Sequence, residues 1–189
     1  MRPNAIFRLG PAVLVGGGVV YPLLVYFGLP YVSPGVLVLV ALGLLALRML
    51  AARREAFRHQ WTPPLLVSGI ALAILAAVSP SIAVRAYPVL VSVAAACVFG
   101  ASLLSPPTVV ERIARMTTPD LSPEGVVYTR AVTQIWTLFL AGNGSVAAAL
   151  AVWGTVEQWT LWTGLVSYLL MGFLFAGERV VRRFYLRQA

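Results

Sequence analysis

The sequence predicts an all-α fold: a polytopic membrane protein with a six-helix transmembrane bundle in one integral membrane domain, residues 1–189. Composition is the first reason, because 60% of the 189 residues are hydrophobic and only 11% are charged. A soluble domain carries about 25% charged residues. The second reason is that apolar residues come in runs of roughly 20, the helix length that crosses a bilayer. The third is that the arginines stand in short stretches between these runs.

Six apolar runs can each be assigned to a membrane span. The expected spans cover residues 9–28, 36–52, 65–78, 87–104, 131–153 and 161–177. A count of five spans stays open, because the stretch from residue 65 to residue 104 divides least clearly. Prolines and polar residues mark the connections between spans. We expect Pro63 and Pro64 to close the second loop, residues 79–88 to join the third and fourth spans, and residues 154–159 to form a turn.

A short amphipathic stretch lies between the fourth and fifth spans, after two prolines that stop the fourth helix. Residues 108–116 place Glu111 and Arg115 at i, i+4 spacing, beside an apolar side. This pattern is typical of a helix that lies in the membrane surface. We therefore expect an interfacial helix here, followed by a polar loop that leads into the fifth span.

The chain is basic, with fourteen arginines, no lysine and six acidic residues, for a net charge of +8. A basic chain can bind nucleic acid, but these arginines lie between apolar spans, so no nucleic-acid partner is expected. Six spans place thirteen arginines on the side of the two termini and only Arg85 on the other side. The positive-inside rule then predicts that both termini are cytoplasmic.

Polar residues enter the fifth span from its cytoplasmic end. Three of them, Arg130, Gln134 and Thr137, fall at helical spacing and share one face of the helix. Together with nearby arginines they are candidates for binding a lipid or another anion, such as an anionic headgroup or an acyl-phosphate. The candidate residues are Arg112, Arg115, Arg130, Gln134, Thr137, Arg182 and Arg183. The plainer interpretation is that these arginines extend to the lipid headgroups.

Asn143 is the polar residue nearest to the middle of the fifth span, between Gly142 and Gly144. It could contact a substrate at a broken helix, as discontinuous helices of transporters do. It could also form a hydrogen bond between helices, which is the interpretation we favour. In the sixth span a stripe of small residues that includes Gly164 and Gly172 predicts helix–helix packing, as do the two glycines beside Asn143.

Residues that could carry chemistry are few. Glu111 and Glu178 are expected to form interfacial ion pairs with arginines, and neither has the partner that acid–base catalysis needs. The chain has one cysteine, Cys97, and one histidine, His59, with no ligand spacing around them. The sequence therefore predicts no catalytic residue, metal site or cofactor, and an enzyme is the least favoured class of function.

The stretch from the fourth to the fifth span resembles the intracellular septation protein A family of bacterial inner-membrane proteins. The resemblance lies in a proline-stopped helix, the segment ERIARM, a proline-containing loop and the segment RAVTQIWTLFLAGNG. A Trp, a following Phe and a later Asn recur there, and they correspond to Trp136, Phe139 and Asn143. The segment PLLVYFGL also fits. That family is drawn with five spans.

The match is closer to a sister group of uncharacterised membrane proteins, often encoded near acyltransferases, acyl carrier proteins and exporters of aryl-polyene-type pigment pathways. The shared run extends from about Tyr87 to Arg183, including Glu178 and Arg179. The resemblance implies a bacterial inner-membrane location and a role in the cell envelope, and it carries no catalytic residue.

Three functions follow as hypotheses. The first is a non-enzymatic inner-membrane protein of cell-envelope biogenesis that acts through contacts with membrane lipids, other membrane proteins or a second copy of itself. The second is a small transporter or carrier of a lipid or acyl cargo, with its path beside the fifth span. The third is an accessory subunit of lipid or polyene biosynthesis. Polar residues inside the spans are sparse, which favours the first.

Overall fold

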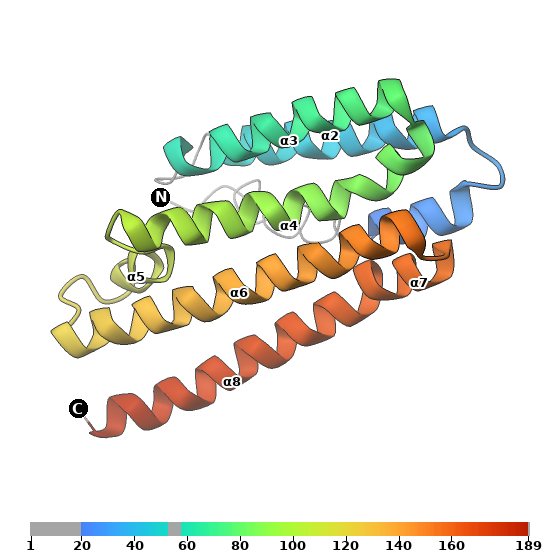
Figure 1. Cartoon of the computed structure of the whole chain (residues 1–189). Coiled ribbons are helices and arrows are strands. Elements are labelled where there is room, and N and C mark those ends of the chain that lie inside the picture. The colour runs from blue at the N-terminus through green and yellow to red at the C-terminus, as the bar shows by residue number, and fades with distance from the viewer. Residues whose placement is uncertain (1–19, 53–57, 189) are drawn as a thin grey trace, which may run out of the picture.

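The computed structural model describes residues 20–52 and 58–188, and this part of the chain folds as a bundle of helices that run alternately up and down (Figure 1). Residues 20–28 are helical at the start of the described chain. The elements that follow are α2 Pro34–Ala52, α3 Arg58–Val78, α4 Pro80–Leu104, α5 Val109–Arg115, α6 Pro123–Trp153, α7 Val156–Leu161, a π-helix Trp162–Val166 and α8 Ser167–Gln188.

Five helices in the described part are long and apolar enough to cross a membrane. They cover Pro34–Ala51, His59–Val78, Pro80–Leu104, Pro123–Trp153 and Val156–Arg182. These segments confirm the expected all-α architecture and indicate a multi-pass membrane protein, and they correspond to the last five expected spans. Most of the first expected span, residues 9–28, lies outside the described residues, so the count of six stays a prediction.

Two connections expected from prolines are helical instead. The helix α3 begins at Arg58 and contains Pro63 and Pro64, which we had placed in a loop. The helix α4 begins at Pro80, so that Ser79 alone separates it from α3. Pro80 fits the first turn of α4 because the N–H that it lacks has no partner there. Pro63 and Pro64 lie inside α3, in its second turn. Both stretches are therefore helical where loops were expected.

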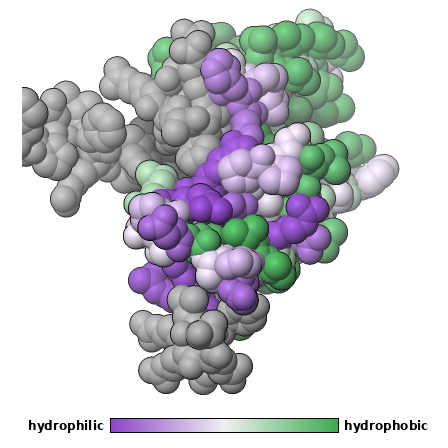
Figure 2. Space-filling view, turned by 90° about the vertical axis from the view of Figure 1, so that its left-hand side faces the viewer, coloured by the Kyte–Doolittle hydropathy of each residue, from purple (hydrophilic) through white to green (hydrophobic). Residues whose placement is uncertain are grey.

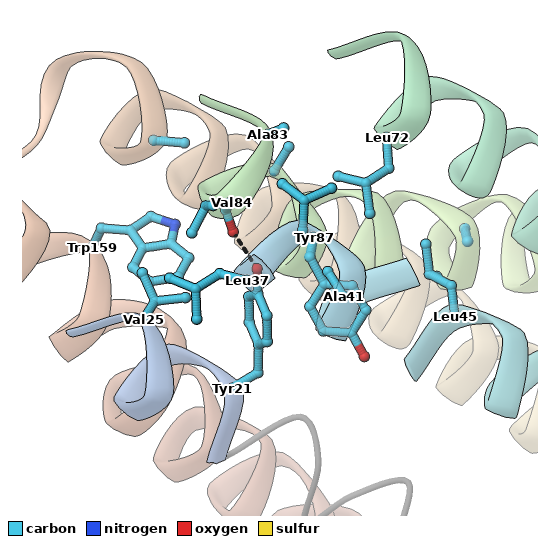
Figure 3. Close-up of a cluster of buried hydrophobic side chains, with 14 of the residues drawn as sticks. Tyr21, Val25, Leu37, Ala41, Leu45, Leu72, Ala83, Val84, Tyr87 and Trp159 are labelled. Carbon is cyan, nitrogen blue, oxygen red and sulfur yellow. Dashed lines mark hydrogen bonds between the residues drawn. The ribbon is translucent and has the colours of Figure 1, made fainter. Parts of the chain in front are cut away.

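The helix α4 also contains Pro88, which lacks the N–H that would bond to the carbonyl of Val84 one turn earlier. The hydroxyl of Tyr21 donates to that carbonyl oxygen at 2.7 Å. A side chain from another helix thus satisfies the acceptor that the proline leaves open, as happens in membrane helices that contain proline. Figure 3 shows this bond within the buried core.

The fifth and sixth spans are longer than expected. Ser122 caps α6 by accepting from the backbone N–H of Gly125, and Pro123 begins the helix, eight residues before the expected start. The next helix begins in the expected turn, because Thr155 and Gln158 form a capping box at the start of α7. The chain then continues through the π-helix into α8.

The core joins residues 20–28 to α2, α3, α4 and α7. Tyr21, Leu45, Leu72, Tyr87 and Trp159 are among its buried side chains. The most extensive helix–helix contact is between α4 and α6. Many large apolar side chains on the outside are exposed, as is typical of helices that face lipid rather than water.

Candidate functional site

Three helices meet at one polar side chain in the middle of the bundle. Asn143 of α6 donates through Nδ2 to Oγ of Ser92 in α4 at 3.2 Å. Its Oδ1 accepts from Oγ of Ser167 in α8 at 2.6 Å. Both serines are buried. The asparagine therefore acts as a hydrogen-bonding contact between helices, which is the interpretation that the sequence favoured.

The contact between Asn143 and Ser92 lies away from the ends of both helices. Asn143 lies ten residues before the end of α6, or about 15 Å at 1.5 Å per residue. Ser92 lies twelve residues after the start of α4. The helix α6 is continuous through Gly142 and Gly144, so it is not broken at these glycines. A binding site of the broken-helix type is therefore not formed here.

Close approach of α4 and α6 depends on Gly144. A Cβ atom at this position would lie 3.3 Å from Cβ of Ser92, which is tighter than ordinary contact. Gly142 faces the other way and has open space around it. One of the two glycines therefore packs inside the bundle as expected, and the other does not.

The π-helix sets the position of Ser167. The N–H of Ser167 reaches the carbonyl of Trp162, five residues earlier. Such π-helical turns are rare in proteins as a whole, but those that occur are often found at functional sites. Beside it, the Nε1 atom of Trp162 and the hydroxyl of Thr160 are buried without a hydrogen-bond partner.

A second polar cluster contains an arginine. Arg48 lies fourteen residues into α2, and its Nε donates to the phenol oxygen of Tyr87 at 3.1 Å. The ring of Tyr87 packs against that of Tyr21 in a tilted arrangement, with ring centroids 4.7 Å apart and an interplanar angle of 59° (Figure 3). Tyr168, next to Ser167, is within electrostatic range of Arg48 and Tyr87.

Arg48 lies within the apolar span of α2, four residues before its end at Ala52. The expected span of residues 36–52 also contains it, and the side of the membrane to which it belongs stays a prediction. Tyr87 lies seven residues into α4, about 10 Å from one end of the helix and about 25 Å from the other. A side chain bonded to it lies inside the bundle, because helical side chains of α2 point back toward its start. The sequence shows Arg48 at the end of an apolar run, and an ionisable residue within a span is by default a candidate functional residue.

The end of the bundle that carries α5 is hydrophilic. Figure 2 views this end and shows hydrophilic side chains beside hydrophobic ones. Glu111 and Arg115 form an ion pair at 2.8 Å within α5, and Glu111 is 5% exposed. Arg115 also donates to the carbonyl of Pro119. The expected ion pair of Glu111 is therefore formed inside one short helix.

The other expected residues of this end have separate surroundings. Glu178 accepts from the phenol of Tyr128 through its side chain and its carbonyl, at 3.3 and 3.2 Å. Arg130 and Gln134 are exposed on α6, whereas the methyl of Thr137 lies toward Gly100 of α4.

The remaining arginines of the expected anion site differ in burial. Arg112 is half-buried and Arg182 is exposed. The side chain of Arg183 lies outside the described residues. Arg112 in α5 and Arg182 near the end of α8 lie at the same end of the bundle (Figure 1).

The stripe of small residues expected on the sixth span is divided. Gly164, within the π-helix, lies against Pro22, and Tyr168 is half-buried. Gly172 and Ala176 are exposed, and a Cβ at Gly172 would meet nothing within 4 Å. The first half of the stripe therefore faces the bundle and the second half faces outward.

The described residues contain no group of three or more metal-ligating side chains. No protein-family model matches the chain, and neither a curated protein nor a solved structure shows significant similarity to it.

Proposed function

We propose that this chain is a non-enzymatic inner-membrane protein of the bacterial cell envelope, with six spans and both termini in the cytoplasm. It acts by binding another membrane helix, from a partner or from a second copy. The observation that supports the proposal most is the outward face of α8, where Gly172 and Ala176 are exposed four residues apart. Small residues at this spacing let two membrane helices approach closely.

The surroundings of these small residues fit a helix contact. Leu169 and Phe173, on the same face, are 52% and 74% exposed. Together with Gly172 and Ala176 they form one exposed face of α8, in which two small residues alternate with two large apolar ones. The helix α8 has little backbone contact with α6, and one contact between the two helices is that of Phe175 with Trp136, whose ring centroids are 4.6 Å apart.

The hydrophilic end supports a role at the membrane surface. The arginines of this end, with α5 as an interfacial helix, would contact the anionic headgroups of the inner leaflet, at about 1 kcal/mol per arginine near the surface. The resemblance to septation-type proteins fits this role. An accessory subunit of lipid or polyene biosynthesis would use the same contacts.

The test is Gly172→Leu, with Gly142→Leu as a matched control. Both substitutions enter open space, so neither disturbs the packing of the chain, but only Gly172 belongs to the small-residue face of α8. We expect Gly172→Leu to reduce crosslinking in membranes at least fivefold and Gly142→Leu to leave it unchanged. Equal crosslinking in the two variants would contradict the proposal.

The second candidate function is a carrier of a lipid or acyl cargo beside α6. The polar contact of Asn143 with Ser92 and Ser167 favours it, because polar side chains inside a membrane bundle often mark a path. Both ends of the Asn143 amide are used in packing, so Asn143→Leu alone cannot separate the two roles.

Two serine variants separate packing from carriage. Ser92→Ala and Ser167→Ala each break one of the same helix contacts but leave the amide in place. In vesicles that contain a fluorescent phosphatidylglycerol, a carrier predicts that Asn143→Leu stops lipid movement while both serine variants keep it. Equal loss in all three variants would assign the amide to packing alone.

A further inference from the structure

Two carbonyl groups of α4 accept hydrogen bonds from side chains of other elements, and both stand just before Pro88. This proline lacks the N–H that would bond to the carbonyl of Val84, which accepts instead from the hydroxyl of Tyr21 at 2.7 Å (Figure 3). The carbonyl of Arg85, the next along the chain, accepts from Nε1 of Trp159 in α7 at 3.2 Å. Two donors from outside α4 therefore meet at its proline.

Both donors belong to the buried core. Tyr21 and Trp159 are each 0% exposed, and the ring of Tyr21 packs against that of Tyr87. A buried hydroxyl or indole N–H is costly to leave without an acceptor. The two bonds therefore hold the stretch before Pro88 to residues 20–28 on one side and to α7 on the other.

The two parts of α4 on either side of Pro88 are attached to different places on α6. Before the proline, Nη1 of Arg85 donates to the carbonyl of Gly154, at the corner between α6 and α7, at 3.0 Å. After the proline, Ser92 accepts from Asn143, ten residues before the end of α6. The proline thus lies between two attachments, at a position where a bend moves one part of the helix and leaves the other in place.

We propose that Pro88 is the hinge of a gate at the end of the bundle opposite α5. The stretch Pro80–Tyr87 swings away from the corner between α6 and α7, and Tyr21 and Trp159 are the latches that hold it closed. Both latch bonds are formed in the structure, which is the closed position. Proline suits a hinge because the helix has no backbone hydrogen bond to break at that turn.

The depth of the latches allows the gate to open. Val84 lies four residues after the start of α4, or about 6 Å along the helix. The carbonyl of Val84 and the hydroxyl of Tyr21 can therefore bond to water near the membrane surface once they separate. Deeper in the bilayer the same groups would stay without a partner, at a high cost.

An open gate gives access from this side of the membrane toward Ser92, which lies four residues beyond the hinge and is bonded to Asn143. The proposal does not rest on the association of α8 with another helix, because it concerns other residues. A monomeric protein would leave it unchanged.

The first test measures the gate in the full-length protein with two spin labels. Ser81→Cys and Glu157→Cys, in a Cys97→Ala background, place one label before the hinge and one on α7, and both positions are exposed. In nanodiscs of phosphatidylethanolamine and phosphatidylglycerol, we expect double electron–electron resonance to give two distance populations. The longer one should grow at least threefold in Tyr21→Phe, which removes a latch. A single distance in both proteins would overturn the proposal.

The variant Pro88→Ala separates a hinge from a loss of packing. Alanine supplies the N–H that bonds to the carbonyl of Val84, so the hydroxyl of Tyr21 is no longer needed there. We expect the longer distance to disappear in Pro88→Ala and to stay absent when Tyr21→Phe is added. If the double variant kept the longer distance, the effect of Tyr21→Phe would be lost packing and the hinge would be excluded.

Amide hydrogen exchange decides the matter without Pro88→Ala, in case that variant does not fold. The amides of residues 89–91 bond across the proline to carbonyls one turn earlier. We expect them to exchange at least fivefold faster in Tyr21→Phe than in the unaltered protein, and those of residues 96–100 to stay within twofold. The matched control is Tyr128→Phe, which removes a hydroxyl bond at the other end of the bundle. An equal increase in both variants, or none in Tyr21→Phe, would contradict the proposal.

Discussion

Asn143 joins α4, α6 and α8 because its side chain carries both a donor and an acceptor. Serine or threonine in its place would offer a single hydroxyl, and neither would reach both Ser92 and Ser167. Hydrogen bonds between membrane helices contribute about 0.6 kcal/mol on average and up to about 1.7 kcal/mol. Two such bonds at one residue make this the polar contact whose removal is easiest to measure.

We expect Asn143→Ala to lower the free energy of unfolding by about 1 to 2 kcal/mol, because it removes both bonds and leaves two buried serine hydroxyls without this partner. The matched control is Ser145→Ala, since Ser145 is exposed and its hydroxyl bonds only to the carbonyl of Ala141. Reversible unfolding in mixed micelles, followed by circular dichroism, measures both. Equal shifts in the two variants would contradict the bridging role.

The sequence identified Asn143 but not its partners, because one serine in an apolar run has no distinguishing pattern. Ser92 and Ser167 become recognisable only when three helices are in place. Arg48 was visible in the sequence, but its position near the end of an apolar run made it resemble the arginines that follow it. The direction of its side chain, back along α2 to Tyr87, decided its location.

No pattern in the sequence predicts the π-helix Trp162–Val166. A turn closed by i to i+5 bonds holds one residue more than an α-helical turn. It therefore changes which side chains of α8 face α6, and it places Ser167 opposite Asn143. The small residues of α8 are four positions apart, whereas a helical turn holds 3.6 residues, so each lies slightly further around the helix than the one before. This shift and the π-helix together explain why the stripe is divided.

Deleting Leu165, which is exposed within the π-helix, removes the extra residue. We expect the shortened turn to become α-helical, so that Ser167 keeps its position and the protein keeps its thermal stability within a few degrees. Deleting Leu170 from the regular part of α8 rotates Phe175 and Glu178 away from α6 by about 100°, and we expect a clear loss of stability. Thermal unfolding measures the stability of both variants. If deletion of Leu165 lowered the melting temperature more than deletion of Leu170, Leu165 would not be part of a turn that holds an extra residue.

Helix type could be predicted from the sequence more securely than helix ends. The apolar runs located five spans correctly, because hydrophobic length decides whether a helix can cross a membrane. The starts of α3 and α4 lie earlier than expected, because Pro80 occupies the first turn of α4 and α3 continues through Pro63 and Pro64. Ser122-Pro123 shows the pattern that would have located the start of α6, a capping serine followed by proline.

At the scale of the whole molecule, the connections alternate between two ends of the bundle (Figure 1). The loop before α2 and the turn before α7 lie at one end, and α5 lies at the other end. The positive-inside rule places the arginine-bearing end in the cytoplasm. The described helices agree with such an alternation, and the orientation stays a prediction.

Single cysteines test the orientation, in a Cys97→Ala background. Ser33 and Thr155 are exposed in connections at one end, and Thr118 is exposed at the other end. We expect a membrane-impermeant maleimide to label Ser33→Cys and Thr155→Cys in intact cells, and Thr118→Cys only after permeabilisation. Labelling of Thr118→Cys in intact cells would reverse the orientation.

The association of α8 with another helix is tested most directly by a native mass spectrum of the protein extracted in a mild detergent. We predict a defined oligomer or a complex with a co-extracted membrane protein, which Gly172→Leu converts to the monomer and Gly142→Leu leaves intact. A monomer for the unaltered protein, across detergents that preserve known membrane complexes, would contradict the proposed function.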